Sequence, residues 1–274
     1  MTEIIAEIGI NHNGNIEIAK KLIDVAHASG CNYVKFQKRN IDLVYSKAEL
    51  DTPRESPWGT TTRDQKYGLE FFRDHYQIID SYCHRKGIWW FASPWDEDSV
   101  LFLNQFKDCQ FIKIPSALIT NDSILEESRD TGKPIILSTG MSTLDMVDHA
   151  IDVVGKDKIY CIMHCTSTYP SKPEELNLRC ITTLREKYPW AKIGFSNHNP
   201  GIIFMPIAVA LGAEMIEFHI TLDRSIYGSD QSASIEPEGT FKLVKHIRNV
   251  GLAMGDGVKK IYDSEIPIIK KLRK

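Results

Sequence analysis

Two histidines follow neighbouring β-rich runs and are the residues best suited to hold a metal ion. His198 lies in Phe-Ser-Asn-His and His219 lies in Glu-Phe-His-Ile-Thr. If the two runs form adjacent strands, both imidazoles reach one rim. Two neutral imidazoles with oxygen ligands suit manganese, iron or zinc, and an open position lets the ion polarise a carbonyl. A single histidine is more often structural, as we expect for His164 inside a predicted buried strand.

Two lysines interrupt otherwise apolar runs. Lys35 lies in Val-Lys-Phe-Gln and Lys113 in Ile-Lys-Ile-Pro-Ser. An isolated ammonium group inside a protein is costly unless it is paired. An anionic ligand would pair both lysines, whereas the alternative is an internal salt bridge to Glu7 or Glu217, and the two can coexist. Serines at neighbouring strand ends add donors for phosphate and carboxylate groups, and they are Ser93, Ser116, Ser138 and Ser196.

Three carboxylates are candidates for acid and base roles. Glu7 and Glu217 lie on the first and last predicted strands, which are neighbours in a closed barrel, and Asp230 follows the last strand. A carboxylate near a metal ion and lysines can activate water or relay a proton. The structural alternative is that the carboxylates hold the lysines in place, and both interpretations stay open.

Eight short β-rich runs must position these residues. Most are continuously apolar, as expected for parallel strands covered on both sides, and each precedes a segment of helical period. This alternation predicts a (β/α)8 TIM barrel rather than an open doubly wound sheet, with polar strand ends gathered on one face. The runs are Ile4–Ile10, Tyr33–Gln37, Ile88–Ala92, Phe111–Ile114, Pro134–Ser138, Ile159–His164, Lys192–Phe195 and Met215–Ile220.

Two helices and one long connection can be predicted in more detail. The first helix has its apolar stripe before Gly30, at Ala19, Leu22, Ile23 and Ala26. The second ends at Gly87, with a stripe formed by Leu69, Phe72, Tyr76, Ile79 and Cys83. The stretch from Lys38 to about Arg63 is long for a connection in a barrel. It is expected to be a lid or a sugar-contacting loop, with a solvent-exposed insertion as the alternative.

Composition excludes several classes of function. The chain has 274 residues, 33 basic and 36 acidic, for a net charge of −3, so nucleic acid is not an expected partner. No basic leader or long apolar run is present, which predicts a cytoplasmic protein without a membrane partner. Six cysteines without a Cys-x-x-Cys pair are expected to be reduced thiols. Sequence signatures of nucleotide binding and serine hydrolysis are also missing.

Motifs spread over nearly the whole chain resemble the N-acetylneuraminate (sialic acid) synthases and their legionaminic and pseudaminic relatives. Each motif alone is weak, but their order is that of the family. They are Ala-Glu-Ile-Gly-Ile-Asn-His-Asn-Gly, Val-Lys-Phe-Gln, Ala-Ser-Pro-Trp-Asp, Ile-Lys-Ile-Pro-Ser, Leu-Ser-Thr-Gly-Met, His-Cys-Thr-Ser-Thr-Tyr-Pro, Gly-Phe-Ser-Asn-His and Glu-Phe-His-Ile-Thr.

The resemblance implies a homodimeric transferase that condenses phosphoenolpyruvate with an open-chain N-acyl amino-sugar aldehyde, giving a 3-deoxy-2-keto sugar acid and phosphate. It places a divalent cation, manganese first and magnesium, cobalt, iron or zinc as alternatives, on His198 and His219. Catalytic roles fall to Glu7, Glu217 and Lys113. The sugar would contact Gln37, Tyr169 and Asp230. Phosphoenolpyruvate would be held by Lys35, Ser93, Lys113, Ser116, Ser138 and Ser196.

The sequence departs from the family pattern in two places. Leu118 stands where a glutamate usually reaches the sugar, and Ser167 stands where many members have asparagine. The chain stops where the family usually continues into an antifreeze-protein-like domain, so we expect a catalytic barrel over residues 1–254 and a linker-like tail over 255–274.

Other functions compete with this interpretation. One is synthesis of another 3-deoxy-ulosonic acid from a neutral or phosphorylated sugar. Another is a catalytically silent barrel that binds a sugar or a partner synthase. A metal-dependent hydrolase ranks last, because the usual His-x-His on the first strand is missing.

Overall fold

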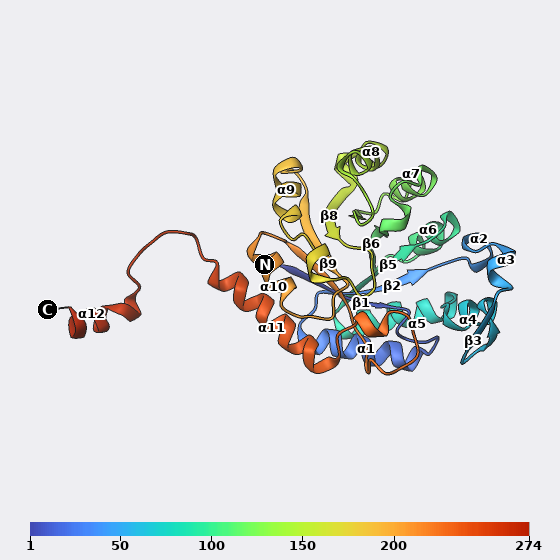
Figure 1. The fold of residues 1–274 in the computed structure, drawn as a ribbon, viewed down its shortest axis with the longest axis horizontal. Helices are drawn as coiled ribbons and strands as arrows, with labels where there is room; N and C mark the ends of the chain where they lie inside the picture. Colours follow the sequence, from blue (N-terminus) through green and yellow to red (C-terminus); the bar gives the residue numbers. More distant parts are fainter. Residues whose placement is uncertain (274) are drawn as a thin grey trace.

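Eight parallel strands close into a barrel in the computed structural model, which describes residues 1–273 (Figure 1). The order around the barrel is β1-β10-β9-β8-β7-β6-β5-β2, so the first and last of these strands pair and close the sheet. This confirms the predicted TIM barrel and all eight predicted runs. The strands are β1 (Glu3–Gly9), β2 (Tyr33–Lys38), β5 (Trp89–Pro94), β6 (Cys109–Ile114), β7 (Ile135–Ser138), β8 (Ile159–Cys165), β9 (Lys192–Asn197) and β10 (Met215–His219).

Helices surround the barrel, and short 3-10 turns complete several connections (Figure 1). The helices of the barrel are α1 (Ile16–Ser29), α4 (Thr62–Leu69), α5 (Arg73–Lys86), α6 (Glu97–Asn104), α7 (Asp122–Asp130), α8 (Leu144–Val154), α9 (Cys180–Lys187), α10 (Phe204–Ala210) and α11 (Pro237–Ala253). The 3-10 turns are η1 (Ser116–Leu118), η2 (Lys156–Lys158), η3 (Pro173–Glu175), η4 (Gln231–Ala233) and η5 (Asp263–Glu265).

The lower part of the barrel interior is filled by aromatic side chains. The ring of Phe111 lies 5.4 Å from those of Tyr33 and Phe91 and 4.7 Å from that of Tyr160. Lys192 closes this layer, because its ammonium group donates to the Tyr160 hydroxyl at 2.6 Å. The barrel is therefore a packed core rather than a channel, and any ligand must bind at the carboxyl ends of the strands.

The predicted ends of two helices are confirmed, and one predicted beginning is wrong. Gly30 and Gly87 end α1 and α5 in the left-handed conformation that glycine favours. The predicted second helix is two helices, because α4 ends at Leu69 and α5 begins at Arg73. Between them Glu70 is extended and its carboxylate lies 2.5 Å from the ammonium group of Lys38. As a result Phe72 caps α5 with 49% of its surface exposed instead of joining the apolar stripe.

The stretch after β2 is ordered rather than a structureless loop. It forms two single-turn helices and a hairpin, α2 (Ile41–Val44), α3 (Lys47–Leu50), β3 (Pro53–Ser56) and β4 (Gly59–Thr61). Ser46 and Thr61 cap α3 and α4 with capping boxes. Arg63 joins the parts by contacting Asp42 at 3.2 Å and Asp51 at 3.3 Å. The segment stands to one side of the barrel mouth in Figure 1.

Beyond α11 the chain leaves the barrel as an extended arm that ends in α12 (Ile266–Leu272), visible at the left of Figure 1. Most of its side chains are exposed, including Tyr262 and Leu272. Within residues 1–273 no helix is both long and apolar enough to cross a membrane.

A matched pair of glycines tests the packing of the barrel mouth. Gly14 and Gly87 both have positive φ, but an added Cβ at Gly14 would overlap the carbonyl oxygen of Gly68, whereas Gly87 faces open space. We expect Gly87→Ala to lower the free energy of unfolding by about 1–2 kcal/mol. Gly14→Ala should cost about 1–3 kcal/mol more, because the backbone must shift. Chemical denaturation of both variants measures the difference, and equal losses would contradict this close approach.

Candidate active site

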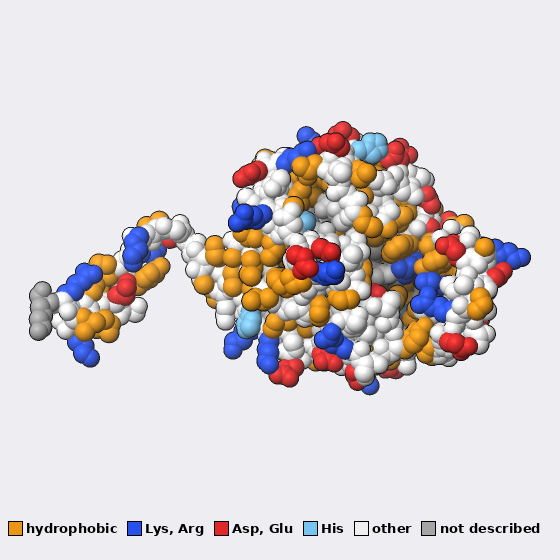
Figure 2. All heavy atoms as spheres, viewed as in Figure 1, with side chains coloured by type: hydrophobic (Ala, Val, Ile, Leu, Met, Phe, Trp, Pro, Cys, Tyr) orange, Lys and Arg blue, Asp and Glu red, His pale blue; other side chains and the backbone are white. Residues whose placement is uncertain are grey.

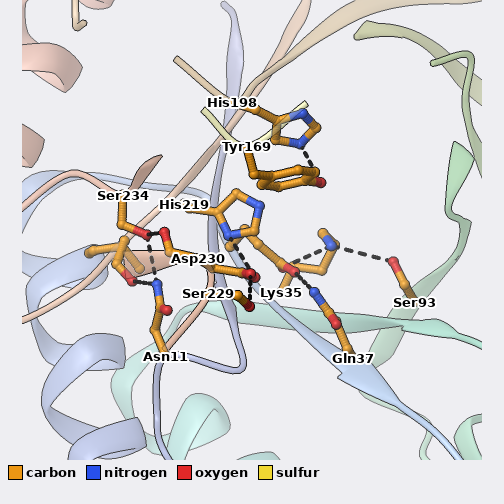
Figure 3. Close-up of polar contacts among 12 residues, drawn as sticks. Asn11, Lys35, Gln37, Ser93, Tyr169, His198, His219, Ser229, Asp230 and Ser234 are labelled. Carbon is orange, nitrogen blue, oxygen red and sulfur yellow. Dashed lines mark hydrogen bonds and ion pairs between the residues drawn. The ribbon is translucent and has the colours of Figure 1, made fainter. Parts of the chain in front are cut away.

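A cavity at the carboxyl ends of the barrel strands collects almost every residue singled out in the sequence. Its polar lining comes from seven of the strands, β1, β2, β5, β6, β7, β9 and β10, and from loops at the same ends of the strands, including the loop after β8 that carries Ser167 and Tyr169. Among the predicted site residues Asp230 is the exception, since it lies beside His219 and is not part of the cavity wall (Figure 3). The predicted residues that line the cavity are Glu7, Lys35, Gln37, Ser93, Lys113, Ser116, Ser138, Tyr169, Ser196, His198, Glu217 and His219.

The floor of the cavity is a buried network of two lysines and two carboxylates. The Lys113 ammonium group lies 2.6 Å from Glu217 Oε1, and that of Lys35 lies 2.8 Å from Glu7 Oε2 and 3.9 Å from Glu217 Oε1. Ser196 donates to Glu217 at 3.0 Å. All four charged side chains are at least 95% buried. The predicted internal salt bridges are therefore present, and the lysines remain at the cavity surface where an anion could also reach them.

Mutual attraction keeps this network ionised despite its burial. Burial alone would raise the pKa of Glu217, but Lys113 and Lys35 outweigh it and lower the pKa to about 2. Burial alone would lower the pKa of Lys35, but Glu217 and Glu7 outweigh it and raise the pKa above its ordinary value. Glu217 is thus a carboxylate at neutral pH, available to accept hydrogen bonds.

The two imidazoles meet on the rim as predicted, with ring centroids 5.5 Å apart (Figure 3). His198 Nδ1 lies 2.6 Å from the Thr166 carbonyl oxygen, which can only accept, so Nδ1 carries the proton. Nε2 then has the free lone pair and accepts from the Tyr169 hydroxyl at 2.9 Å. Burial and the neighbouring His219 lower the pKa of His198 to about 3. His198 is therefore a neutral imidazole whose free nitrogen faces the cavity.

The donor set suits a divalent cation that takes part of its coordination from substrate. His219 Nδ1 is buried without a hydrogen-bond partner, 3.6 Å from Asp230 Oδ2. A cation could therefore engage His219 and replace the Tyr169 hydroxyl on His198 Nε2. In residues 1–273 no three His, Cys, Asp or Glu side chains converge on one point, so the remaining ligands would be oxygens of substrate or water.

The loop carrying Asp230 is held against the start of the chain. Asn11, which is 2% exposed, donates through Nδ2 to the Ile220 carbonyl at 2.9 Å and to Ser234 Oγ at 2.8 Å. Ser234 in turn donates to the Asp230 carbonyl at 2.6 Å (Figure 3). In the sequence Asn11 stands out only as a member of the motif Ala-Glu-Ile-Gly-Ile-Asn-His-Asn-Gly. Its role is to pin the loop after β10 onto the loop after β1, which positions Asp230 beside His219.

Several lining residues were not singled out from the sequence. Trp95, Met141 and Cys165 contribute to the wall. Each belongs to a motif of the family resemblance, namely Ala-Ser-Pro-Trp-Asp, Leu-Ser-Thr-Gly-Met and His-Cys-Thr-Ser-Thr-Tyr-Pro, but none has a side chain that marks it as a binding residue. Ser167 lines the cavity, whereas Leu118 is partly buried and packs against the hydrophobic core.

Two further expectations are confirmed with small differences. His164 is hydrogen-bonded as expected, but to the Leu176 carbonyl at 2.7 Å on the outer side of the barrel rather than in its interior. All six cysteines are free thiols.

The fold and this site define a TIM barrel with a polar cavity at the carboxyl ends of its strands, and comparison with known proteins gives its family. The NeuB family model matches residues 22–259. The chain is 38% identical over 274 residues to mouse N-acetylneuraminate-9-phosphate synthase, covering 99% of this chain and 76% of the relative. It is 37% identical to N,N'-diacetyllegionaminic acid synthase of Campylobacter jejuni, covering 100% and 83% of the two chains.

Comparison with solved structures supports the same family and fold. The crystal structure of N-acetylneuraminic acid synthetase from Leptospira borgpetersenii matches with a TM-score of 0.85 and 31% identity, covering 100% of this chain and 93% of the other. A truncated 3-deoxy-D-arabino-heptulosonate 7-phosphate synthase from Thermotoga maritima, at 15% identity and a TM-score of 0.70, shares the fold. The chain belongs to the NeuB family and is a phosphoenolpyruvate-condensing synthase that acts on a sugar.

Replacing Glu217 with glutamine tests the buried network. Glu217→Gln leaves Lys113 buried without its carboxylate, so we expect the free energy of unfolding to fall by about 3 kcal/mol at pH 7. Because folding lowers the pKa of Glu217, its stabilisation is fully present above pH 4.5 and is lost as the pH falls toward 2.

The difference in stability between the wild type and Glu217→Gln should therefore shrink across this pH range. Denaturation of both proteins at a series of pH values measures it. A difference that stays constant with pH would show that the Glu217 carboxylate does not stabilise the fold as an anion.

Proposed function

We propose that this protein condenses phosphoenolpyruvate with an open-chain N-acyl amino-sugar aldehyde, forming a sialic-acid-like 3-deoxy-2-keto sugar acid and inorganic phosphate. The observation that carries the proposal is the juxtaposition of the buried lysine and carboxylate network with two neutral imidazoles at one cavity. In the overall reaction C3 of phosphoenolpyruvate attacks the aldehyde carbon, water adds at C2, and phosphate leaves. We assign this chemistry to residues 1–254, with 255–274 as a separate tail.

Phosphoenolpyruvate would lie on the lysine side of the cavity. Lys35 and Lys113 would neutralise its phosphate and carboxylate while staying paired with Glu7 and Glu217. Ser138 supports this placement, because its hydroxyl is buried without a partner. Ser93 already contacts Lys35 at 3.3 Å, and Ser116 accepts from the Gly140 amide at 3.0 Å. Ser196 would complete a set of hydroxyl donors around the leaving phosphate.

Formal charges explain why a divalent cation fits this site. The two lysines carry +2, while Glu7, Glu217 and Asp230 carry −3, which leaves −1. An anionic substrate would be repelled by that charge, and a divalent cation changes it to +1. When bound at His198 and His219, the ion, manganese by preference, would supply polarisation of the aldehyde oxygen.

The remaining polar groups have complementary tasks. Glu7 accepts from Gln37 Nε2 at 3.0 Å and lies 2.8 Å from the Lys35 ammonium group, and these contacts support a role for its carboxylate as the base for the water. Lys113 and Glu217, which are 2.6 Å apart, would serve as a second acid-base pair. Gln37, Tyr169 and Asp230 would hold the sugar, and pre-positioning of two substrates supplies a large part of the rate enhancement.

Two features of the proposal concern the substrate and the assembly. A phosphorylated sugar is the second candidate substrate, since the mouse relative is named for a 9-phosphate product. A homodimer is expected, and exposed Ile203, Ile207 and Phe241 offer an apolar surface for it near α10 and α11.

Phosphate release from phosphoenolpyruvate tests the proposal. With manganese and a panel of N-acylated hexosamines, neutral sugars and sugar phosphates, we expect aldehyde-dependent release and, by mass spectrometry, a condensed acid of matching mass. His219→Ala should lower kcat at least about 100-fold, because the aldehyde loses its electrophilic activation. Chelation of the metal should have the same effect, and added manganese should reverse it.

His149→Ala is the matched control, since His149 is exposed and pairs with Asp122 outside the candidate site. It should retain full activity. Unchanged turnover in His219→Ala with an intact fold would remove the metal role assigned to His219. Metal retention without turnover on the whole panel would favour the silent sugar-binding barrel.

A further inference from the structure

Three cationic residues, Lys38, Arg39 and Arg73, form a wall just beyond Gln37. Arg39 follows β2, donates to the Gln37 side-chain oxygen, and places its guanidinium group 4.4 Å from the centre of the Trp95 ring. Gln37 and Trp95 line the candidate active site, whereas Arg39 faces an adjoining cavity that Lys38 and Arg73 also line. Arg39 is therefore part of the partition between the two cavities. Figure 2 shows Lys and Arg side chains gathered beside the hollow in the barrel face.

The charge of Arg39 has no carboxylate partner. Lys38 is neutralised by Glu70 at 2.5 Å, but over residues 1–273 no carboxylate oxygen lies within 4.0 Å of the Arg39 guanidinium group. Its Nε and the indole nitrogen of Trp95 are both buried donors without an acceptor. Unpaired charge and unmet donors in a partly buried place are costly. An acceptor-rich anion would relieve both costs after a small adjustment of these side chains.

The geometry relates this wall to the proposed aldehyde site. Glu7 accepts from Gln37 Nε2 at 3.0 Å, and the other end of the same amide accepts from Arg39. In Figure 3 Gln37 lies on the side of Lys35 away from His198. An aldehyde whose carbonyl is at the histidines and whose chain passes Gln37 would thus direct its far end toward Arg39. Lys35 and Lys113 belong to the buried network, and in the proposed function they bind phosphoenolpyruvate.

We propose that Arg39 determines substrate specificity by binding an oxyanion, a phosphate or a carboxylate, at the end of the aldehyde remote from its carbonyl. This inference rests on the proposed function. A guanidinium group suits the task because it presents planar paired donors to such anions. Stacking on Trp95 and the bond to Gln37 hold it in one orientation before the substrate arrives, which reduces the entropy lost on binding.

Steady-state kinetics of three variants test the role of Arg39. The substrates are an N-acetylhexosamine, its 6-phosphate and a hexuronic acid, each with phosphoenolpyruvate and manganese. The wild type should have a higher kcat/KM for one of the two acidic aldehydes than for the neutral sugar. Whether that aldehyde is the phosphate or the carboxylate identifies the anion. Arg39→Met should lower kcat/KM for that aldehyde about 10- to 100-fold. The kcat/KM for the neutral sugar and the KM for phosphoenolpyruvate should change less than about threefold.

The other two variants separate charge, geometry and general effects. Arg39→Lys keeps the charge without the planar fork and should recover only part of the loss. Arg63→Met removes an arginine of the same segment that already pairs with Asp42 and Asp51, so it should leave the selectivity unchanged. An equal loss for neutral and acidic aldehydes in Arg39→Met would overturn the proposal, as would a selective rise in the KM for phosphoenolpyruvate.

Direct binding separates failure of this inference from failure of the proposed function. Absence of turnover on every aldehyde would contradict the proposed function alone. Calorimetric titration of the wild type and Arg39→Met with N-acetylhexosamine 6-phosphate and with the hexuronic acid, without phosphoenolpyruvate, then decides the role of Arg39. At least about tenfold weaker binding of either ligand to the variant supports it. If the wild type and Arg39→Met bind each ligand with equal affinity, the proposal is overturned. It is also overturned if the wild type binds neither ligand.

Discussion

The pairing of two buried lysines with two buried carboxylates is the interaction on which the site depends. Glu7, Lys35, Lys113 and Glu217 come from β1, β2, β6 and β10, so the network joins strands on different sides of the barrel. None of these charges could remain in the interior alone, because an unpaired buried ion is strongly destabilising. The same pairing that makes the barrel tolerate four charges also presents two ammonium groups to the cavity.

The other half of the site is nearly free of formal charge. His198 is kept neutral by burial and by its neighbour, and its ring is oriented by the Thr166 carbonyl. The cavity therefore has an ionic side and an imidazole side. This division suits a reaction between an anion and a polarised carbonyl, because each substrate meets the groups that favour it. The loop that carries Asp230 closes the imidazole side through Asn11 and Ser234.

Much of the barrel and the site could be predicted from the sequence, because both leave short-range signals. Strands buried on both faces, such as β8, are continuous apolar runs, and polar residues at their ends stand out. Long-range contacts leave no such signal. The break between α4 and α5 results from the ion pair of Glu70 with Lys38, thirty-two residues away. Arg39 resembled any loop arginine in the sequence, since the absence of a carboxylate partner is visible only in three dimensions.

The seam between β1 and β10 has a consequence for biosynthesis. Asn11 reaches Ile220 across 209 residues, and Lys113 reaches Glu217 across 104. A ribosome makes the amino-terminal half first, so Lys113 is made before Glu217, the carboxylate with which it pairs. An unpaired ammonium group is costly to bury, so Lys113 has to stay solvated until β10 is available. The active site is complete only when the last strand pairs with the first and the barrel closes.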